Sequence, residues 1–209
     1  MELWALRYDP ADREAEEILR PYAPGERSGG VGSLWGWALL QMVLERRGMV
    51  FPRVEREAGG KPCFPDCLQL HFSLSHTEGA VFLALSSRPV GADIEPLRPA
   101  PPRLAERFGL TGEEFFRSWV RREARGKRTG RGVLRELRQE TPMEEGERFA
   151  FAEAFPGYVA GVSAMEDVPD TVNRCTAEEL LAAADRTKRT EQRESFGNRY
   201  SHLYVSHNN

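Results

Sequence analysis

Residues 90–95 read VGADIE, a stretch that starts like a buried strand and ends on two acidic residues, Asp93 and Glu95. Successive side chains of a strand alternate between its two faces, so these acids share one face while Ile94 takes the other. Two neighbouring carboxylates repel each other unless a positive group lies between them. The stretch therefore predicts a strand whose end carries an anionic site in need of a cation.

The segments around this strand predict a mixed α+β protein. Residues 96–102, PLRPAPP, hold four prolines in seven positions, so they cannot form a helix interior or a central strand and we expect a linker there. Hydrophobic patterns and turn residues on both sides of it predict helices and short strands. The strands are expected at residues 3–8, 70–76, 80–87, 89–95, 148–154 and 157–164, and the helices at 12–22, 33–47, 103–108, 112–127 and 176–186.

This distribution predicts two α+β halves, residues 1–96 and 97–185, followed by a loosely ordered polar tail at 186–209. Clefts between such halves are common ligand sites. The strand that carries Asp93 and Glu95 ends where the linker begins, so the acidic pair is expected to lie at the crevice between the halves.

The composition of the chain excludes several classes of protein. Its 209 residues are 40% hydrophobic, enough for a core, and a net charge of −3 argues against a globally basic nucleic-acid-binding protein. No apolar run approaches the roughly 20 residues of a membrane-spanning helix, and the first residues lack the basic start of a secretion signal. Three cysteines, an odd number, argue against a disulfide framework. We expect a cytoplasmic protein, and a monomer, that binds neither membrane nor nucleic acid.

An exposed acidic pair is often no more than a solvated surface. Here the residues before it, SSRPVGA at 86–92, read as a buried strand, and the pair directly precedes the linker. Hard cations such as Mg²⁺ bind one or two carboxylates and complete their coordination with water and substrate phosphate. Asp93 and Glu95 are therefore candidate magnesium ligands.

The helical segment downstream is strongly basic. Between Arg117 and Arg138 the chain has nine Arg or Lys against two Glu, which indicates either an anionic neighbour or a solvated face. Glu123 and Lys127 lie four residues apart on one helix face, and the simplest interpretation is a surface ion pair worth about 0.3 kcal/mol. An acid within such a segment is also well placed to act as a third metal ligand or as a base, with cations nearby for phosphate.

Two short polar motifs precede the acidic pair. Lys61 follows two glycines and precedes a proline in a stiff turn, where it either meets a phosphate or is simply solvated. Ser75 and His76 end a predicted strand and can donate hydrogen bonds to phosphate. Because adjacent strand residues point apart, His76 is poorly placed to activate Ser75 as a nucleophile.

A zinc site is an alternative for the same region. Cys63, Cys67, His71 and His76 are spaced C-x3-C-x3-H-x4-H, which superficially matches zinc ligands. Only three residues separate the cysteines from His71, against about twelve in a zinc finger. The two histidines are also expected on opposite faces of a strand. Structural zinc is therefore the weaker interpretation.

In order and rough spacing, these motifs resemble those of the 4′-phosphopantetheinyl transferases of the surfactin-synthetase-activating type. That family has a G-K-P turn, an F-N-x-S-H strand, then G-x-D-x-E and W-[ST]-x-K-E-A-x-x-K. The chain reads GKP at 60–62, FSLSH at 72–76, GADIE at 91–95 and WVRREARGK at 119–127. The resemblance extends from the first predicted strand to about Ala184.

The resemblance implies a fold of two similar α+β halves related by a pseudo-twofold axis, with coenzyme A between them. It implies a Mg²⁺ ion held by Asp93, Glu95 and Glu123. The 4′-phosphopantetheine arm of coenzyme A would move to a serine of an apo acyl or peptidyl carrier protein, with release of 3′,5′-ADP. Glu123 would accept the proton of that serine, and Lys127 would stabilise charge on the phosphates.

The same resemblance implies how the two substrates are held. The phosphates of coenzyme A would be contacted by Lys61, Ser75 and His76, with Arg27 and Ser33 as further candidates. Carrier proteins of this system are commonly acidic near the modified serine. In the basic segment, Arg121 and Arg125 are therefore the candidates for docking the carrier protein.

The chain departs from the family pattern at several positions. Gly32 stands where family members carry an arginine, so coenzyme A would be held weakly there and Gly32→Arg should strengthen its binding. Val120 replaces a serine or threonine, and Arg122 replaces a lysine. Because the glycine-rich segment is altered, the alternative function is that of a non-catalytic relative that binds coenzyme A or a carrier protein. A nucleic-acid-binding module that uses the basic helix is a less favoured alternative.

Overall fold

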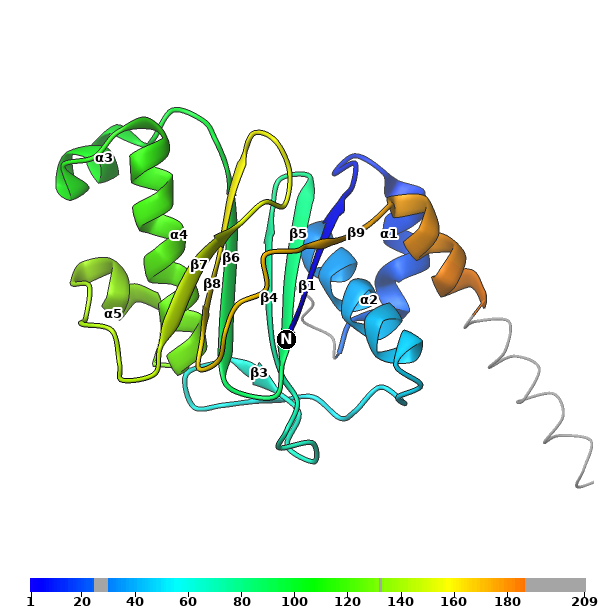
Figure 1. Cartoon of the computed structure of the whole chain (residues 1–209). Coiled ribbons are helices and arrows are strands. Elements are labelled where there is room, and N and C mark those ends of the chain that lie inside the picture. Colours follow the sequence, from blue (N-terminus) through cyan, green and yellow to red (C-terminus); the bar gives the residue numbers. More distant parts are fainter. Residues whose placement is uncertain (25–29, 132, 187–209) are drawn as a thin grey trace, which may run out of the picture.

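Two β-sheets pack face to face, and helices cover their outer faces, as the layers in Figure 1 show. The first sheet has the strand order β4-β5-β1-β9 and the second the order β6-β8-β7. The structure is a computed structural model that describes residues 1–24, 30–131 and 133–186. Its strands are β1 (Glu2–Arg7), β2 (Glu55–Arg56), β3 (Pro62–Cys63), β4 (His71–Thr77), β5 (Ala80–Ser86), β6 (Val90–Pro96), β7 (Arg148–Ala152), β8 (Tyr158–Ala164) and β9 (Asn173–Cys175).

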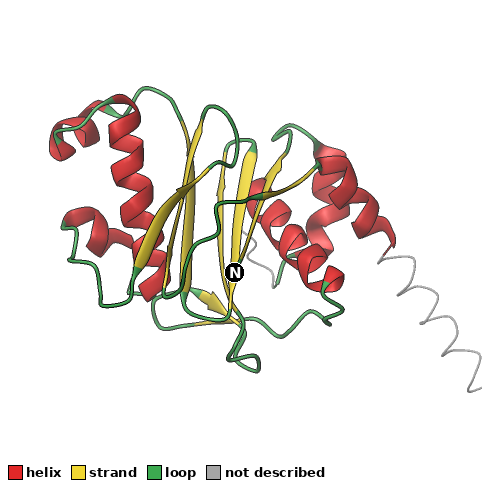
Figure 2. Cartoon of the chain, viewed as in Figure 1, coloured by secondary structure: helices red, strands yellow, loops and turns green. Residues whose placement is uncertain are grey.

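The helices form the two outer layers of the molecule (Figure 2). One layer covers the first sheet and contains α1, η1 and α2, while α4 covers the second sheet and is flanked by α3 and α5 (Figure 1). Residues 177–186 are also helical and lie beside α1 and α2. The helix bounds are α1 (Arg13–Leu19), η1 (Arg20–Tyr22), α2 (Val31–Arg46), α3 (Pro102–Phe108), α4 (Gly112–Thr129) and α5 (Val133–Arg138).

The first sheet is apolar on both faces because it lies between a helical layer and the second sheet. Along β5, Val81, Leu83 and Leu85 pack against the α2 side. The alternate residues, among them Phe82 and Ala84, pack against residues of β6 and β8. Every residue of β5 is buried, which is the continuous apolar pattern expected of a strand covered on both faces.

The second sheet receives α4 on its outer face through an aromatic stripe. Phe115, Phe116 and Val120 of α4 are buried in one cluster with Val159 of β8. The helix ends where Gly130 adopts a left-handed conformation with φ of 65°. This packing holds the polar part of α4 along the edge of the sandwich where β6 lies.

Most of the predicted elements are confirmed, including the helix of residues 112–127, the hairpin of residues 148–164 and the strand of residues 89–95. Four elements were not predicted. They are helix α5, the two-residue strands β2 and β3, and β9, which pairs in parallel with β1. Leu180, in the helix that follows β9, packs with the core of the first sheet, so the chain returns to the first layer after building the second. The predicted polar tail lies, from residue 187 onward, outside the described residues.

The described ranges contain no helix that is both long enough and apolar enough to cross a membrane. Cys63, Cys67 and Cys175 are free thiols.

Candidate active site

Along one border of the sandwich, the edge strands β4 and β6 of the two sheets are joined by side-chain hydroxyls. The hydroxyl oxygen of Ser73 accepts a hydrogen bond from the backbone N–H of Ala92, at 2.9 Å. That of Ser75 accepts one from the N–H of Ile94, at 3.4 Å. These two contacts align β4 with β6, and we call this boundary between the sheets the seam.

Helix α4 lies directly on the backbone of β6 because Gly91 has no side chain. A Cβ atom on Gly91 would lie 1.9 Å from the carbonyl oxygen of Ala124 and 2.3 Å from the amide nitrogen of Arg128. Both are backbone atoms, so neither can move aside without moving the helix. The glycine of the G-x-D-x-E motif thus allows α4 to approach the face of β6 on which Asp93 lies.

Four polar side chains meet at the seam. The ammonium Nζ of Lys127 lies 2.6 Å from Oδ1 of Asp93, 3.0 Å from the hydroxyl oxygen of Ser75 and 3.5 Å from Oε2 of Glu123. The Ser75 hydroxyl donates to the same Oδ1 of Asp93, at 2.7 Å. The three predicted elements β4, β6 and α4 therefore each contribute to one cluster. We call these four residues, together with Glu95, which interacts electrostatically with Asp93 and Lys127, the seam cluster: Ser75, Asp93, Glu95, Glu123 and Lys127.

The seam cluster carries more negative charge than its single ammonium can compensate. Burial, followed by repulsion from Asp93, raises the pKa of Glu95 to about 7, and the same two causes raise the pKa of Glu123 to about 7. Burial alone would lower the pKa of Lys127, but Asp93 and Glu123 outweigh it and raise that pKa above its usual value. Lys127 therefore stays charged. Glu95 and Glu123 have pKa values close to neutral pH, so a small change in their surroundings changes their protonation.

These raised pKa values predict how stability depends on pH in the metal-free protein. Between their usual pKa of 4.5 and about 7, Glu95 and Glu123 keep protons in the folded state that the unfolded chain has released, so stability falls as pH rises through this window. Glu123→Gln should therefore be more stable than the unsubstituted protein at about pH 8, by at most about 3 kcal/mol, and no more stable at about pH 4.5. Urea unfolding in the presence of EDTA at both pH values measures this, and a gain of equal size at both would contradict it.

The donor set of the seam cluster fits a hard divalent cation. Oδ2 of Asp93 is buried with no hydrogen-bond partner among the described residues, an uncommon state for a carboxylate oxygen. Carboxylate oxygens are also the ligands that Mg²⁺ prefers. Within the described ranges no group of three acidic, histidine or cysteine side chains is arranged closely enough to bind a metal ion. At the seam cluster, the Lys127 ammonium lies against two of the three carboxylates, those of Asp93 and Glu123.

The same result bears on the zinc alternative. Cys63, Cys67, His71 and His76 are all described, and they do not gather into a metal site. His71 lines a pocket with Lys61 on one side of β4, whereas His76 lies beside Gly32 of α2. The structure therefore contradicts the zinc interpretation, because the two histidines face different parts of the molecule.

Gly32 lies in close contact with two side chains. A Cβ atom there would lie 2.7 Å from Nδ1 of His76 and 2.7 Å from the hydroxyl of Tyr8, so an arginine would have to displace them. Stronger coenzyme A binding by Gly32→Arg stays a prediction. The glycine is needed for this contact between the first turn of α2 and the end of β4. Ser33 follows it in the same turn. Arg27 lies outside the described residues.

Lys61 is half-buried and its ammonium is engaged by the protein itself. Its Nζ donates to the carbonyl oxygen of Val90 at 2.9 Å and to that of Arg128 at 3.3 Å. The side chain lines a pocket of about 230 Å³ at the seam together with Lys127. Contact between Lys61 and a phosphate of coenzyme A stays a prediction.

A larger pocket lies elsewhere on the described part of the chain. It measures about 490 Å³ and opens between the β7–β8 hairpin and the first turns of α4. Arg117 and Arg174 line it, but no residue of the seam cluster does. The smaller pocket is therefore the better candidate for a ligand that must reach Lys127.

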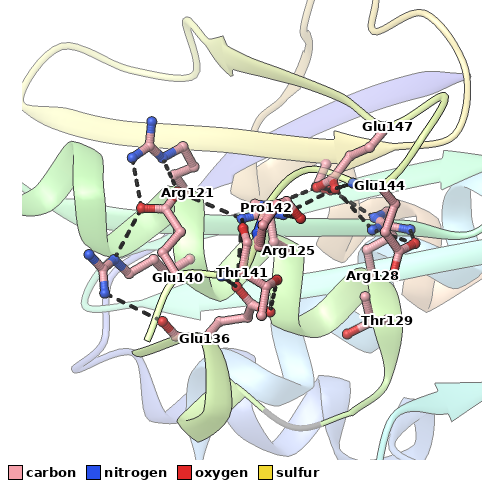
Figure 3. Close-up of polar contacts among 12 residues, drawn as sticks. Arg121, Arg125, Arg128, Thr129, Glu136, Glu140, Thr141, Pro142, Glu144 and Glu147 are labelled. Carbon is pink, nitrogen blue, oxygen red and sulfur yellow. Dashed lines mark hydrogen bonds and ion pairs between the residues drawn. The ribbon is translucent and has the colours of Figure 1, made fainter. Parts of the chain in front are cut away.

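The two arginines that were expected to dock a carrier protein, both labelled in Figure 3, differ in exposure. Arg121 is half exposed and pairs with Glu140 at 2.9 Å. Arg125 is only 3% exposed and donates to Glu147 at 2.7 Å and to the backbone carbonyls of residues 141 and 142. The structure thus contradicts the exposed position that a docking role requires of Arg125.

Arg125 belongs to a buried charge network that the sequence analysis did not foresee. Glu147 is 3% exposed and accepts hydrogen bonds from Arg125, from the Ser163 hydroxyl and from the N–H of Glu144. Arg128 is also buried and bonds to Ser163 and to Glu144. Burial opposes ionisation of Glu147, but the Arg125 guanidinium holds its pKa below the usual value. The signal in the sequence was the acidic segment 136–147, which directly follows the basic one.

No protein-family model matches the chain. Among individual proteins, it is similar to the 4′-phosphopantetheinyl transferase Sfp of Bacillus subtilis (strain 168), at 28% identity over 71% of this chain and 81% of the relative. It is also similar to the 4′-phosphopantetheinyl transferase psf-1 of Bacillus pumilus, at 28% identity over 64% of this chain and 70% of the relative. The resemblance that the motifs indicated is confirmed: the chain is similar to 4′-phosphopantetheinyl transferases of the surfactin-synthetase-activating type, and the names of these relatives support an enzyme of this type.

Proposed function

We propose that this protein transfers the 4′-phosphopantetheine arm of coenzyme A to a serine of an apo acyl or peptidyl carrier protein and releases 3′,5′-ADP. The observation that carries the proposal is the seam cluster, in which Lys127, Asp93 and Glu123 of the family's last two motifs meet within hydrogen-bond and ion-pair distances. The relatives, which are named 4′-phosphopantetheinyl transferases, supply the reaction type. The proposal includes two halves of similar α+β fold about a pseudo-twofold axis, with the seam between them.

In this proposal coenzyme A lies along the seam with its phosphates near the cluster. Ser75 and His76 at the end of β4 and Ser33 in the first turn of α2 are the candidate contacts on the side of the first sheet. The end of an α-helix that exposes N–H groups favours anions. Lys127 has access to the pocket at the seam and is the candidate contact on the side of the second sheet.

The chemical step is a displacement at the β-phosphorus of coenzyme A. The hydroxyl oxygen of the carrier serine forms a bond to this phosphorus, the bond to the bridging oxygen breaks, and 3′,5′-ADP leaves with that oxygen. Glu123 takes the serine proton, a role suited to a carboxylate that α4 holds beside Lys127 at the seam. Lys127, held charged by its neighbours, stabilises the negative charge that develops on the phosphates.

Asp93, Glu95 and Glu123 would hold Mg²⁺ in the substrate complex. When bound, the ion would neutralise charge on the pyrophosphate and on the three carboxylates. The buried, unpartnered oxygen of Asp93 and the raised pKa values of the two glutamates support this assignment. The role of Asp93 before the ion binds is to hold Lys127 and Ser75 in position.

Carrier docking is proposed for the exposed cations of α4, with Arg121 as the candidate that remains. Arg121→Glu should raise the KM for an acidic carrier protein about fivefold at low ionic strength, because exposed charges steer binding. At 1 M salt the Debye length is about 3 Å, so this rise should largely disappear. The KM for coenzyme A should not change. Both constants are measured at low and high salt.

The reversal of Arg13, which is exposed on α1 far along the chain from α4, serves as the matched control. It should leave both constants unchanged at either salt concentration. A rise in the coenzyme A KM for Arg121→Glu would show that this arginine serves the nucleotide rather than the partner.

The release of 3′,5′-ADP separates an enzyme from a relative that only binds. The protein is incubated with coenzyme A, Mg²⁺ and an apo carrier protein, and the nucleotide products are separated by chromatography. The proposal predicts 3′,5′-ADP in amounts equal to the carrier protein consumed, and none when the carrier serine is replaced by alanine. Tight binding of coenzyme A without nucleotide release would support the non-catalytic alternative.

A further inference from the structure

Lys61 lies at the C-terminal end of α4, where the helix leaves carbonyl oxygens without intrahelical partners. The last four carbonyls of an α-helix have no such partner and carry a partial negative charge. Arg128 is one of these four residues, and its carbonyl oxygen accepts a hydrogen bond from Nζ of Lys61 at 3.3 Å. The hydroxyl of Thr129 donates to the carbonyl of Gly126, another of the four. Lys61 therefore acts chemically as a cap supplied from a distant turn.

The same ammonium also holds β6. Its second hydrogen bond, at 2.9 Å, goes to the carbonyl oxygen of Val90, the first residue of that strand. Lys127 adjoins Arg128 in α4, and Asp93 lies three residues after Val90 in β6. Lys61 thus bridges α4 and β6. It does so close to Lys127 and Asp93, which form the centre of the seam cluster.

The turn that carries Lys61 is built to fit this position. It is closed by hydrogen bonds from the N–H of Glu57 to the carbonyl of Lys61 and from the N–H of Gly60 to the carbonyl of Glu57. A Cβ atom on Gly59 would lie 1.6 Å from the carbonyl oxygen of Gly130, the residue that ends α4. The backbone of the turn therefore touches the end of the helix, and a side chain at position 59 would force them apart.

From this geometry we infer that Lys61 is a positioning residue, which clamps the C-terminal end of α4 to the start of β6 and so sets Lys127 against Asp93. This role differs from the phosphate contact that the resemblance implies for a lysine in the GKP turn. The two roles predict opposite kinetic effects. A phosphate ligand acts on the binding of coenzyme A, whereas a clamp acts on the placement of Lys127 and hence on turnover.

The burial of the Lys61 ammonium supports its role as a positioning residue. Burial lowers the pKa of Lys61, and the carboxylate of Glu57 opposes that shift. An ammonium that donates to two backbone carbonyls has one proton left, which leaves little of its donor capacity for a phosphate.

The test uses Lys61→Met, which keeps the length of the side chain and removes its donors, and Gly59→Ala, which separates the turn from the helix without changing any charge. Arg53→Met, an exposed cation in the same loop region, is the control for net charge. Hydrogen–deuterium exchange should be about tenfold faster in residues 126–130 for both test variants, with β5 unchanged, because only the helix end is released. The control should exchange as the unsubstituted protein does.

The kinetic readout rests on the proposed function. For both test variants kcat should fall about tenfold while the KM for coenzyme A stays within about twofold, the pattern of a lost transition-state contact. A raised KM with kcat retained, and unchanged exchange at the helix end, would overturn the clamp and restore the phosphate contact. Exchange needs no turnover, so if the unsubstituted protein transfers nothing, the proposed function fails while exchange still decides the role of Lys61.

Discussion

Asp93→Asn is expected to reduce the transfer of phosphopantetheine by about 10³-fold or more without unfolding the protein. The substitution keeps the shape of the side chain and removes its charge, so Lys127 loses its closest anionic partner, at 2.6 Å, and the proposed Mg²⁺ ion loses a ligand. The fold should persist because one charge among three mutually repelling carboxylates is removed. The initial rate of carrier-protein modification at saturating coenzyme A and Mg²⁺ measures the effect.

Glu114→Gln is the matched control, since Glu114 is an exposed acid in the first turn of the same helix. It should transfer at the rate of the unsubstituted protein. Thermal unfolding of both variants checks the fold. If Asp93→Asn retained transfer within about tenfold of the unsubstituted rate, the seam cluster would not be the catalytic site.

Arg125→Met is expected to destabilise the protein by about 3–5 kcal/mol, although Arg125 takes no part in the proposed chemistry. Removing the guanidinium leaves Glu147, with a side chain that is 0% exposed, without its 2.7 Å partner and leaves two backbone carbonyls without a donor. The cost comes from the buried charge that loses its shortest ion pair and keeps only Arg128, at 3.3 Å, as a cationic partner. Urea unfolding at about pH 7 measures it.

Arg121→Met provides the comparison on the same helix, because the Arg121–Glu140 pair is partly exposed and should contribute at most about 1 kcal/mol. The double variant Arg125→Met/Glu147→Leu should recover part of the loss, since it removes both buried charges. Equal losses of stability for Arg125→Met and Arg121→Met would contradict the prediction, because burial would then not increase the contribution of Arg125 to folding.

The elements that the sequence predicted well are those whose patterns reflect local geometry. The alternation and the two acids at 91–95 predicted a strand whose acids need a cation, and Asp93 has the Lys127 ammonium at 2.6 Å. The helix predicted at 112–127 corresponds to α4, which buries Phe115, Phe116 and Val120 on the second sheet. Periodicity reports which face of an element is buried, so these features could be read from one chain.

The features that were missed depend on contacts between distant segments. Nothing in residues 117–138 shows that Arg125 and Arg128 are buried, because their partners come from the segment after α5 and from β8. Strand β9 has only three residues, too few for a pattern, and forms because β1 offers an edge. The contact of Gly32 with His76 likewise joins α2 to β4, so the absent arginine suggested a weak site where the structure has a close packing contact.

The intact mass of an apo carrier protein after incubation with this protein, coenzyme A and Mg²⁺ decides whether transfer takes place. We expect a gain equal to one 4′-phosphopantetheine group, located by fragmentation on a single serine, and no gain with Asp93→Asn or when Mg²⁺ is removed by EDTA. An unchanged carrier mass with the folded, unsubstituted protein and several acyl and peptidyl carrier proteins would contradict the proposed transfer.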